Sequence, residues 1–130
     1  MTEDLGLADR VRFLGFRDDA SALVASFDLF VSSSKTEGMP LGTIEAMGIG
    51  TPVVLTRTGG VPEVVDSGRT GLLVPPGDPH ALAEGILETL ACPDRASEMA
   101  RAGAADVRLR FSSRSMCDAY EGLYELMLSN

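Results

Sequence analysis

An alternation of short apolar runs with helix-forming stretches is the feature that most constrains the fold of this chain. The apolar runs Leu29–Val31 and Val53–Leu55 stand on either side of a helix-forming stretch that follows Pro40. Parallel strands need a long crossover between them, and a helix commonly supplies it. Gly71–Val74 is a further short predicted strand. The sequence therefore predicts an α/β fold with a mostly parallel, doubly wound sheet.

Local signals place the remaining elements. Val11–Leu14 is a predicted strand that Gly15 ends, and Asp18 or Asp19 is expected to cap a helix that runs through Ser26. The other predicted helices are Val61–Asp66, one that Asp78 caps and Pro79 begins, one over about Asp94–Arg110, and one from about Ser112 that carries Met116, Tyr120, Leu123, Tyr124 and Met127 on a single stripe.

Length, charge and cysteine content narrow the class of protein. The chain has 130 residues, which fits one domain, and 45% of them are hydrophobic, which favours a packed core over disorder. The net charge of −8 disfavours nucleic acid and anionic membrane as partners. Cys92 and Cys117 match no metal-ligand spacing and, in a Met-started chain without a signal peptide, indicate reduced thiols and a cytoplasmic location. The apolar runs are too short for a transmembrane helix.

The stretch around Pro40 carries the groups that suggest chemistry. Pro40 suits the first turn of a helix, and the amides of Leu41 and Gly42 are then expected to be free to stabilise a phosphate. Glu37 precedes this helix, and Glu45 lies about one turn into it. A carboxylate repels a phosphate but accepts two hydrogen bonds from a vicinal diol. Diols on both sides of a diphosphate describe a nucleotide sugar, which is the predicted ligand.

At these residues the sequence resembles a known family. Glu37–Met47, followed by Gly50–Pro52, Gly59–Val65 and Gly71–Asp78, is similar to the donor-site signature of retaining glycosyltransferases with the two-Rossmann-domain (GT-B) fold, the glycosyl transferases group 1. The resemblance runs from about Val11 to the C-terminus. It implies that residues 1–130 are a single, truncated nucleotide-sugar-binding domain, the C-terminal half of that GT-B domain. Its first two strands and the N-terminal acceptor domain would then be absent.

The resemblance also implies roles for individual residues. Glu37 would face the donor sugar and stabilise charge near its anomeric carbon, which makes it the catalytic candidate, and Glu45 would bind the ribose. The candidate donor-binding residues beside Glu45 are Gly38, Met39, Pro40, Leu41 and Gly42. The family often has Gly-Phe-Gly at positions 38–40, so Pro40 removes one possible amide donor. The family needs no metal and no cofactor beyond the nucleotide-sugar substrate. Gly59–Gly60 would either line the sugar pocket or form a plain strand-to-helix turn.

The expected function is retaining transfer of a sugar from a UDP- or GDP-sugar to an acceptor hydroxyl in a parent enzyme. The chain alone is expected to be inactive, and the acceptor stays open. Two alternatives are a fragment of a nucleotide-sugar epimerase and a non-catalytic remnant or interaction module. Loss of the central strands would expose an edge at Leu29–Ser32. Either Val11–Leu14 pairs with this edge, or two chains associate through it.

Overall fold

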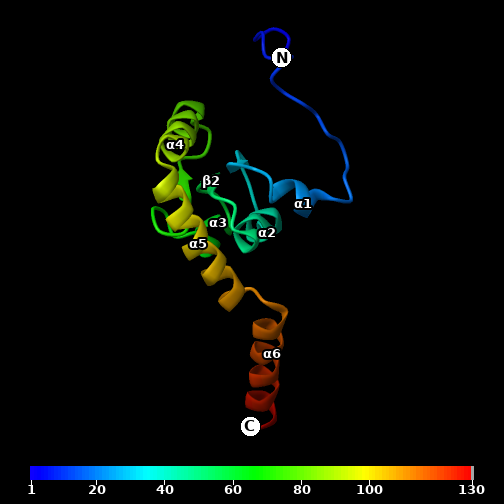
Figure 1. The fold of residues 1–130 in the computed structure, drawn as a ribbon. Coiled ribbons are helices and arrows are strands. Elements are labelled where there is room, and N and C mark those ends of the chain that lie inside the picture. Colours follow the sequence, from blue (N-terminus) through cyan, green and yellow to red (C-terminus); the bar gives the residue numbers. More distant parts are fainter. Residues whose placement is uncertain (130) are drawn as a thin grey trace.

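The computed structural model describes residues 1–129, and its centre is a three-stranded parallel sheet (Figure 1). The strands are β1 (Phe30–Ser32), β2 (Val53–Thr56) and β3 (Leu72–Val74), in the order β1-β2-β3. Phe30 pairs with Val53, and Val54 pairs with Leu72. The predicted α/β fold with parallel strands is confirmed.

Helices cover both faces of this sheet. They are α1 (Ala20–Val24), α2 (Leu41–Ile49), α3 (Val61–Val64), α4 (Pro79–Ala91), α5 (Pro93–Arg110) and α6 (Ser113–Leu128). On one face the side chains of Val53 and Leu55 join a core with residues of α2, α3 and α5. On the other face α4 contacts β2 and β3, and a Cβ at Gly85 would lie only 3.4 Å from Val54 Cγ1. Every residue of β2 is buried, as expected for a central parallel strand.

The predicted strand at Val11–Leu14 is wrong. These residues form no regular element, and the side chain of Phe13 is 84% exposed. Figure 1 shows this segment, in blue, running away from the sheet. In the described part of the chain β1 pairs with β2 alone, so the alternative in which Val11–Leu14 pairs with the edge at Leu29–Ser32 is also wrong. A strand needs a neighbour for its amides and carbonyls, and here none lies beside it.

The helix N-termini follow the expected chemistry at α4 but not at α1 or α2. Asp78 caps α4, because its Oδ1 accepts from the amides of His80 at 3.1 Å and Ala81 at 3.0 Å. Asp19 occupies the N-cap position of α1, but its carboxylate accepts from Arg17 and no side-chain bond caps the helix. Pro40 lies at the N-cap of α2, one residue before the expected first turn.

The last helix, α6, presents its predicted apolar stripe to solvent. Its stripe residues are all exposed: Met116, Tyr120, Leu123, Tyr124 and Met127. In Figure 1 it extends beyond the rest of the fold, in red. Within residues 1–129, no helix has the length and apolar character needed to cross a membrane.

Candidate functional site

The candidate site is centred on the loop of residues 33–40, which joins the carboxyl end of β1 to α2. In open parallel sheets, this end of the strands is where ligands bind. Glu37 is half-buried here, and the Ser34 hydroxyl donates to Glu37 Oε2 at 3.2 Å. The Ser34 hydroxyl also lies 3.1 Å from that of Ser32. Glu37 is therefore a carboxylate with one defined orienting contact.

The N-terminus of α2 offers one free amide instead of two. The amide of Leu41 donates to Met39 O at 2.9 Å, so the prediction that it is free is wrong. The amide of Thr43 donates to Pro40 O at 3.0 Å. Among the described residues, the amide of Gly42 has no partner, and it remains available for an anion.

Glu45 lies on the exposed face of α2. It is one turn from Leu41, so both side chains emerge on the same side of the helix. Within the described chain no hydrogen bond or ion pair engages the Glu45 carboxylate, and none joins it to Glu37. The structure thus places two separate acceptors before and after the free amide of Gly42.

A segment at the end of β2, residues 56–60, supports the loop, and we call it the anchor segment. The Thr56 hydroxyl donates to Ser34 O at 2.6 Å, and the Thr58 hydroxyl donates to Lys35 O at 2.9 Å. Thr56 is 4% exposed. Two consecutive carbonyls of the loop are therefore held by hydroxyls that belong to the neighbouring strand end.

The glycine pair of the anchor segment lies directly against the loop backbone. A Cβ at Gly59 would lie 1.6 Å from Glu37 O, and one at Gly60 would lie 2.3 Å from Gly38 O. The Gly60 amide donates to Glu37 O at 3.4 Å and to Gly38 O at 3.2 Å. Gly59–Gly60 is thus a strand-to-helix turn that also packs on the candidate loop. This contact was not predicted from the sequence, although two threonines and a glycine pair after a buried strand are a visible signal for it.

Two hollows flank the loop. One of about 230 Å³ lies between the loop and the start of α4, and it is lined by Ser33, Lys35, Thr56, Gly77, Asp78, Pro79 and Leu82. The other, of about 430 Å³, is lined by Met39, Leu41, Ile44, Arg110, Phe111, Ser112, Ser113, Ser115, Met116 and Ala119. Of the predicted donor-binding residues, Met39 and Leu41 therefore border an open hollow.

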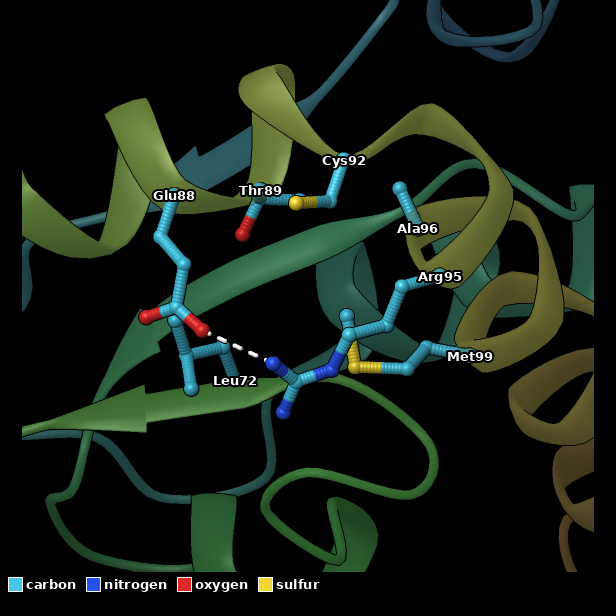
Figure 2. Close-up of a pocket in the computed structure, with 7 residues that line it drawn as sticks. All are labelled: Leu72, Glu88, Thr89, Cys92, Arg95, Ala96 and Met99. Carbon is cyan, nitrogen blue, oxygen red and sulfur yellow. Dashed lines mark hydrogen bonds and ion pairs between the residues drawn. The ribbon is translucent and has the colours of Figure 1, made fainter.

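A further cavity, shown in Figure 2, belongs to the packing of α4 on α5. Its volume is about 10 Å³, close to that of a single water probe. Arg95 donates to Glu88 at 2.9 Å across it, and Met99 and Thr89 also line it (Figure 2). No lining residue belongs to the candidate loop or to α2, so this cavity is a packing gap apart from the candidate site.

Charged groups around the site are few. Lys35 lies within the loop and Arg57 within the anchor segment, and neither forms an ion pair within residues 1–129. Arg17 is engaged elsewhere: its hydrogen bond to Asp19 lowers the pKa of that carboxyl and raises the pKa of the guanidinium. In the described chain no three His, Cys, Asp or Glu side chains gather closely enough to hold a metal ion.

Parallel strands with helices on both faces, and an acidic loop at their carboxyl ends, define part of a doubly wound, Rossmann-like domain. The sequence model of the family "Glycosyl transferases group 1" matches residues 1–92. N-acetyl-alpha-D-glucosaminyl L-malate synthase of Bacillus anthracis is 34% identical over 124 residues, which cover 95% of this chain and 32% of that protein.

Solved structures agree. Sucrose-phosphate synthase from Thermosynechococcus elongatus superimposes with a TM-score of 0.89 at 35% identity, covering 98% of this chain and 33% of its own. Anabaena HepE in complex with UDP-glucose gives a TM-score of 0.87 at 32% identity, covering 99% of this chain and 35% of its own.

The chain belongs to the glycosyl transferases group 1 family. Its predicted fold, a partial doubly wound sheet of the GT-B type, is confirmed by these superpositions. The chain spans about a third of the length of the relatives it matches.

Proposed function

We propose that this chain forms the donor site of a longer glycosyltransferase that moves a sugar from a UDP- or GDP-sugar to an acceptor hydroxyl with retention of configuration. One observation carries the proposal: the half-buried Glu37 stands just before a helix N-terminus whose Gly42 amide is free. Family membership and the UDP-glucose complex of HepE support it.

In this proposal each end of the donor meets a different group. The diphosphate lies at the N-terminus of α2, where the Gly42 amide donates to it. Glu37 accepts from hydroxyls of the sugar, and Ser34 holds its carboxylate in place. Glu45 accepts from the ribose diol. None of these contacts needs a metal ion, and we propose metal-independent transfer.

The proposed reaction breaks the bond between the anomeric carbon and the diphosphate while the acceptor hydroxyl attacks from the same face. The acceptor oxygen bonds to the anomeric carbon, and its proton passes to an oxygen of the leaving diphosphate. The helix N-terminus stabilises the charge that the leaving diphosphate gains. Glu37 stabilises the positive charge that develops near the anomeric carbon. Acceptor binding belongs to the rest of the longer enzyme, so turnover is not expected from residues 1–130 alone. We place this enzyme in the cytoplasm, and the free thiols of Cys92 and Cys117 suit a reducing compartment.

Binding of the donor to the chain itself tests the proposal. We would titrate ¹⁵N-labelled protein with UDP, GDP, UDP-glucose and GDP-glucose and follow the amide resonances. The proposal expects shifts at residues 37–45, with Glu45→Ala weakening every ligand. Glu98→Ala is the matched control, because Glu98 is also an exposed helical glutamate but lies on α5. Shifts confined to other regions, or no shift with any of the four compounds, would refute the proposed site.

Retention is tested separately in the longer enzyme. The anomeric proton coupling of the product, measured before it equilibrates, distinguishes retained from inverted configuration. An inverted product would contradict the mechanism. A nucleotide-sugar product with an altered sugar and no transfer would favour the epimerase, and binding without turnover would favour a non-catalytic module.

A further inference from the structure

We propose that the anchor segment, residues 56–60, sets the position of Glu37, so that Thr56 acts as a positioning residue for the sugar end of the donor. This inference rests on the proposed function for the identity of the ligand. The positioning of the loop by the anchor segment does not depend on the ligand, because these contacts are present in the ligand-free protein.

The first step is a pair of hydrogen bonds that lead from β2 to Glu37. The Thr56 hydroxyl donates to Ser34 O at 2.6 Å, and the Ser34 hydroxyl donates to Glu37 Oε2 at 3.2 Å. Thr56 is the last residue of the buried central strand. The Thr56 and Ser34 hydroxyls therefore connect the Glu37 carboxylate to β2, whose residues are all buried.

The second step is the close contact of backbones. The Gly60 amide donates to both Glu37 O and Gly38 O, and a side chain at Gly59 or Gly60 would overlap these carbonyls. The loop backbone at Glu37 and Gly38 thus lies so close to the anchor segment that no Cβ atom fits between them. Thr58 adds a third attachment at Lys35 O.

Glu37 is held by other contacts than Gly42 and Glu45, the residues proposed to bind the nucleotide. Gly42 and Glu45 belong to α2, and that helix is fixed by its buried residues Ala46 and Met47 and by its packing on α5. The anchor segment bonds to the loop and not to these two residues. A change at Thr56 should therefore move Glu37 and leave the nucleotide contacts in place.

The experiment replaces Thr56 by valine, which keeps the shape and removes the hydroxyl, and by serine, which keeps the hydroxyl. Thr51→Val is the matched control, because Thr51 is equally buried at 4% exposure. Thr51 precedes the start of β2, and its hydroxyl donates to Val24 O at the end of α1, away from the loop. Affinities for UDP-glucose and for UDP are measured on the folded chain by calorimetry or amide titration. Hydrogen exchange of the Gly60 amide, which donates to Glu37 O and Gly38 O, is measured without ligand.

We expect Thr56→Val to weaken UDP-glucose by about fivefold to tenfold, the scale of one lost hydrogen bond, while UDP affinity changes less than about twofold. Exchange of the Gly60 amide should accelerate in the same variant, because its acceptors Glu37 O and Gly38 O belong to the loop. Thr56→Ser should restore both readouts, and Thr51→Val should change neither. If Thr56→Val does not fold, Thr58→Val, at a half-buried position, takes its place with the same expected split.

Equal loss of UDP-glucose and UDP affinity would overturn the proposal, because it would show a general structural effect. Exchange of the Gly60 amide that matches the wild type in both valine variants would overturn it as well. If the wild-type chain binds neither UDP-glucose nor UDP, the same measurements are made with GDP-glucose and GDP, and a chain that binds none of the four would refute the proposed function instead. In that case the exchange of the Gly60 amide would still decide whether the anchor segment positions the loop.

Discussion

The contact between Gly60 and the glutamate loop offers a direct test of the packing that builds the site. In Gly60→Ala the new Cβ would lie 2.3 Å from Gly38 O, far inside van der Waals contact. The φ of Gly60 is −76°, which alanine adopts readily. The substitution therefore tests steric contact alone, because it adds no backbone strain.

The magnitude follows from two opposing effects. Overpacking against a fixed backbone costs about 1–3 kcal/mol, and the smaller conformational freedom of unfolded alanine recovers about 0.4–1 kcal/mol. The loop must shift, and this weakens the bonds from the Gly60 amide to Glu37 O and Gly38 O. We expect the free energy of unfolding to fall by about 1–2 kcal/mol.

The assay is urea unfolding followed by circular dichroism, with the midpoint and slope fitted for each variant. Gly48→Ala is the control, because Gly48 lies within α2 and a Cβ there would meet no atom within 4 Å. That change should raise stability by about 0.5–1 kcal/mol, since glycine is unfavourable inside a helix. A Gly60→Ala protein as stable as the wild type, with wild-type amide chemical shifts in residues 34–39, would refute the tight contact.

Three further predictions concern the carboxylates and the sheet edge. Glu45→Ala should weaken UDP or GDP by roughly 1.5–3 kcal/mol by calorimetry, with Glu98→Ala unchanged; equal affinities would remove Glu45 from the site. In the longer enzyme, Glu37→Gln should lower kcat by about 10²-fold or more with little change in nucleotide affinity, and full kcat would show that the carboxylate is only a loop residue. The chain should associate through the open edge of β1, and Val31→Lys, at a side chain 39% exposed, should shift size-exclusion profiles toward monomer; a wild type monomeric at every concentration would contradict this.

The strands and helices that the sequence predicted correctly are those with strong local signals. Val53–Leu55 is an apolar run bounded by Pro52, and it became the buried central strand. Asp78 followed by Pro79 marks a helix start, because the carboxylate can accept from the first free amides and proline suits the first helical position. Helix α4 begins there. Such signals depend on neighbours in sequence, so no tertiary contact is needed to interpret them.

The strand predicted at Val11–Leu14 failed because a strand is defined by its partner. Valine, phenylalanine and leucine supply the propensity, but a free edge must also lie within reach and in register. Here the segment leaves the sheet, Gly15 takes a left-handed φ of 63°, and α1 begins only at Ala20. Local composition carries no information about which neighbour is present.

The anchor segment escaped prediction for a related reason. Thr56 and Thr58 bond to carbonyls more than twenty residues earlier in the chain, and a backbone carbonyl has no identity in a sequence. Gly59 and Gly60 were expected either to line the sugar pocket or to form a turn, but what excludes larger side chains is the backbone of Glu37 and Gly38. The motif around the two glutamates indicated the candidate site, and only the fold shows which contacts hold its loop in place.

The two carboxylates of the site are positioned by different parts of the fold, and this bears on how the site can change. Glu37 is held against the end of β2 by hydrogen bonds through Ser34 and by the glycine pair Gly59–Gly60. Glu45 moves with α2, whose buried Met47 packs against α5 at Gly103, where an added Cβ would lie 3.1 Å from Met47 Cε. Substitutions in the anchor segment should therefore alter recognition of the sugar, whereas substitutions between α2 and α5 should alter recognition of the nucleotide. Because the sites of change lie on separate elements, their effects on donor affinity should add within a few tenths of a kcal/mol.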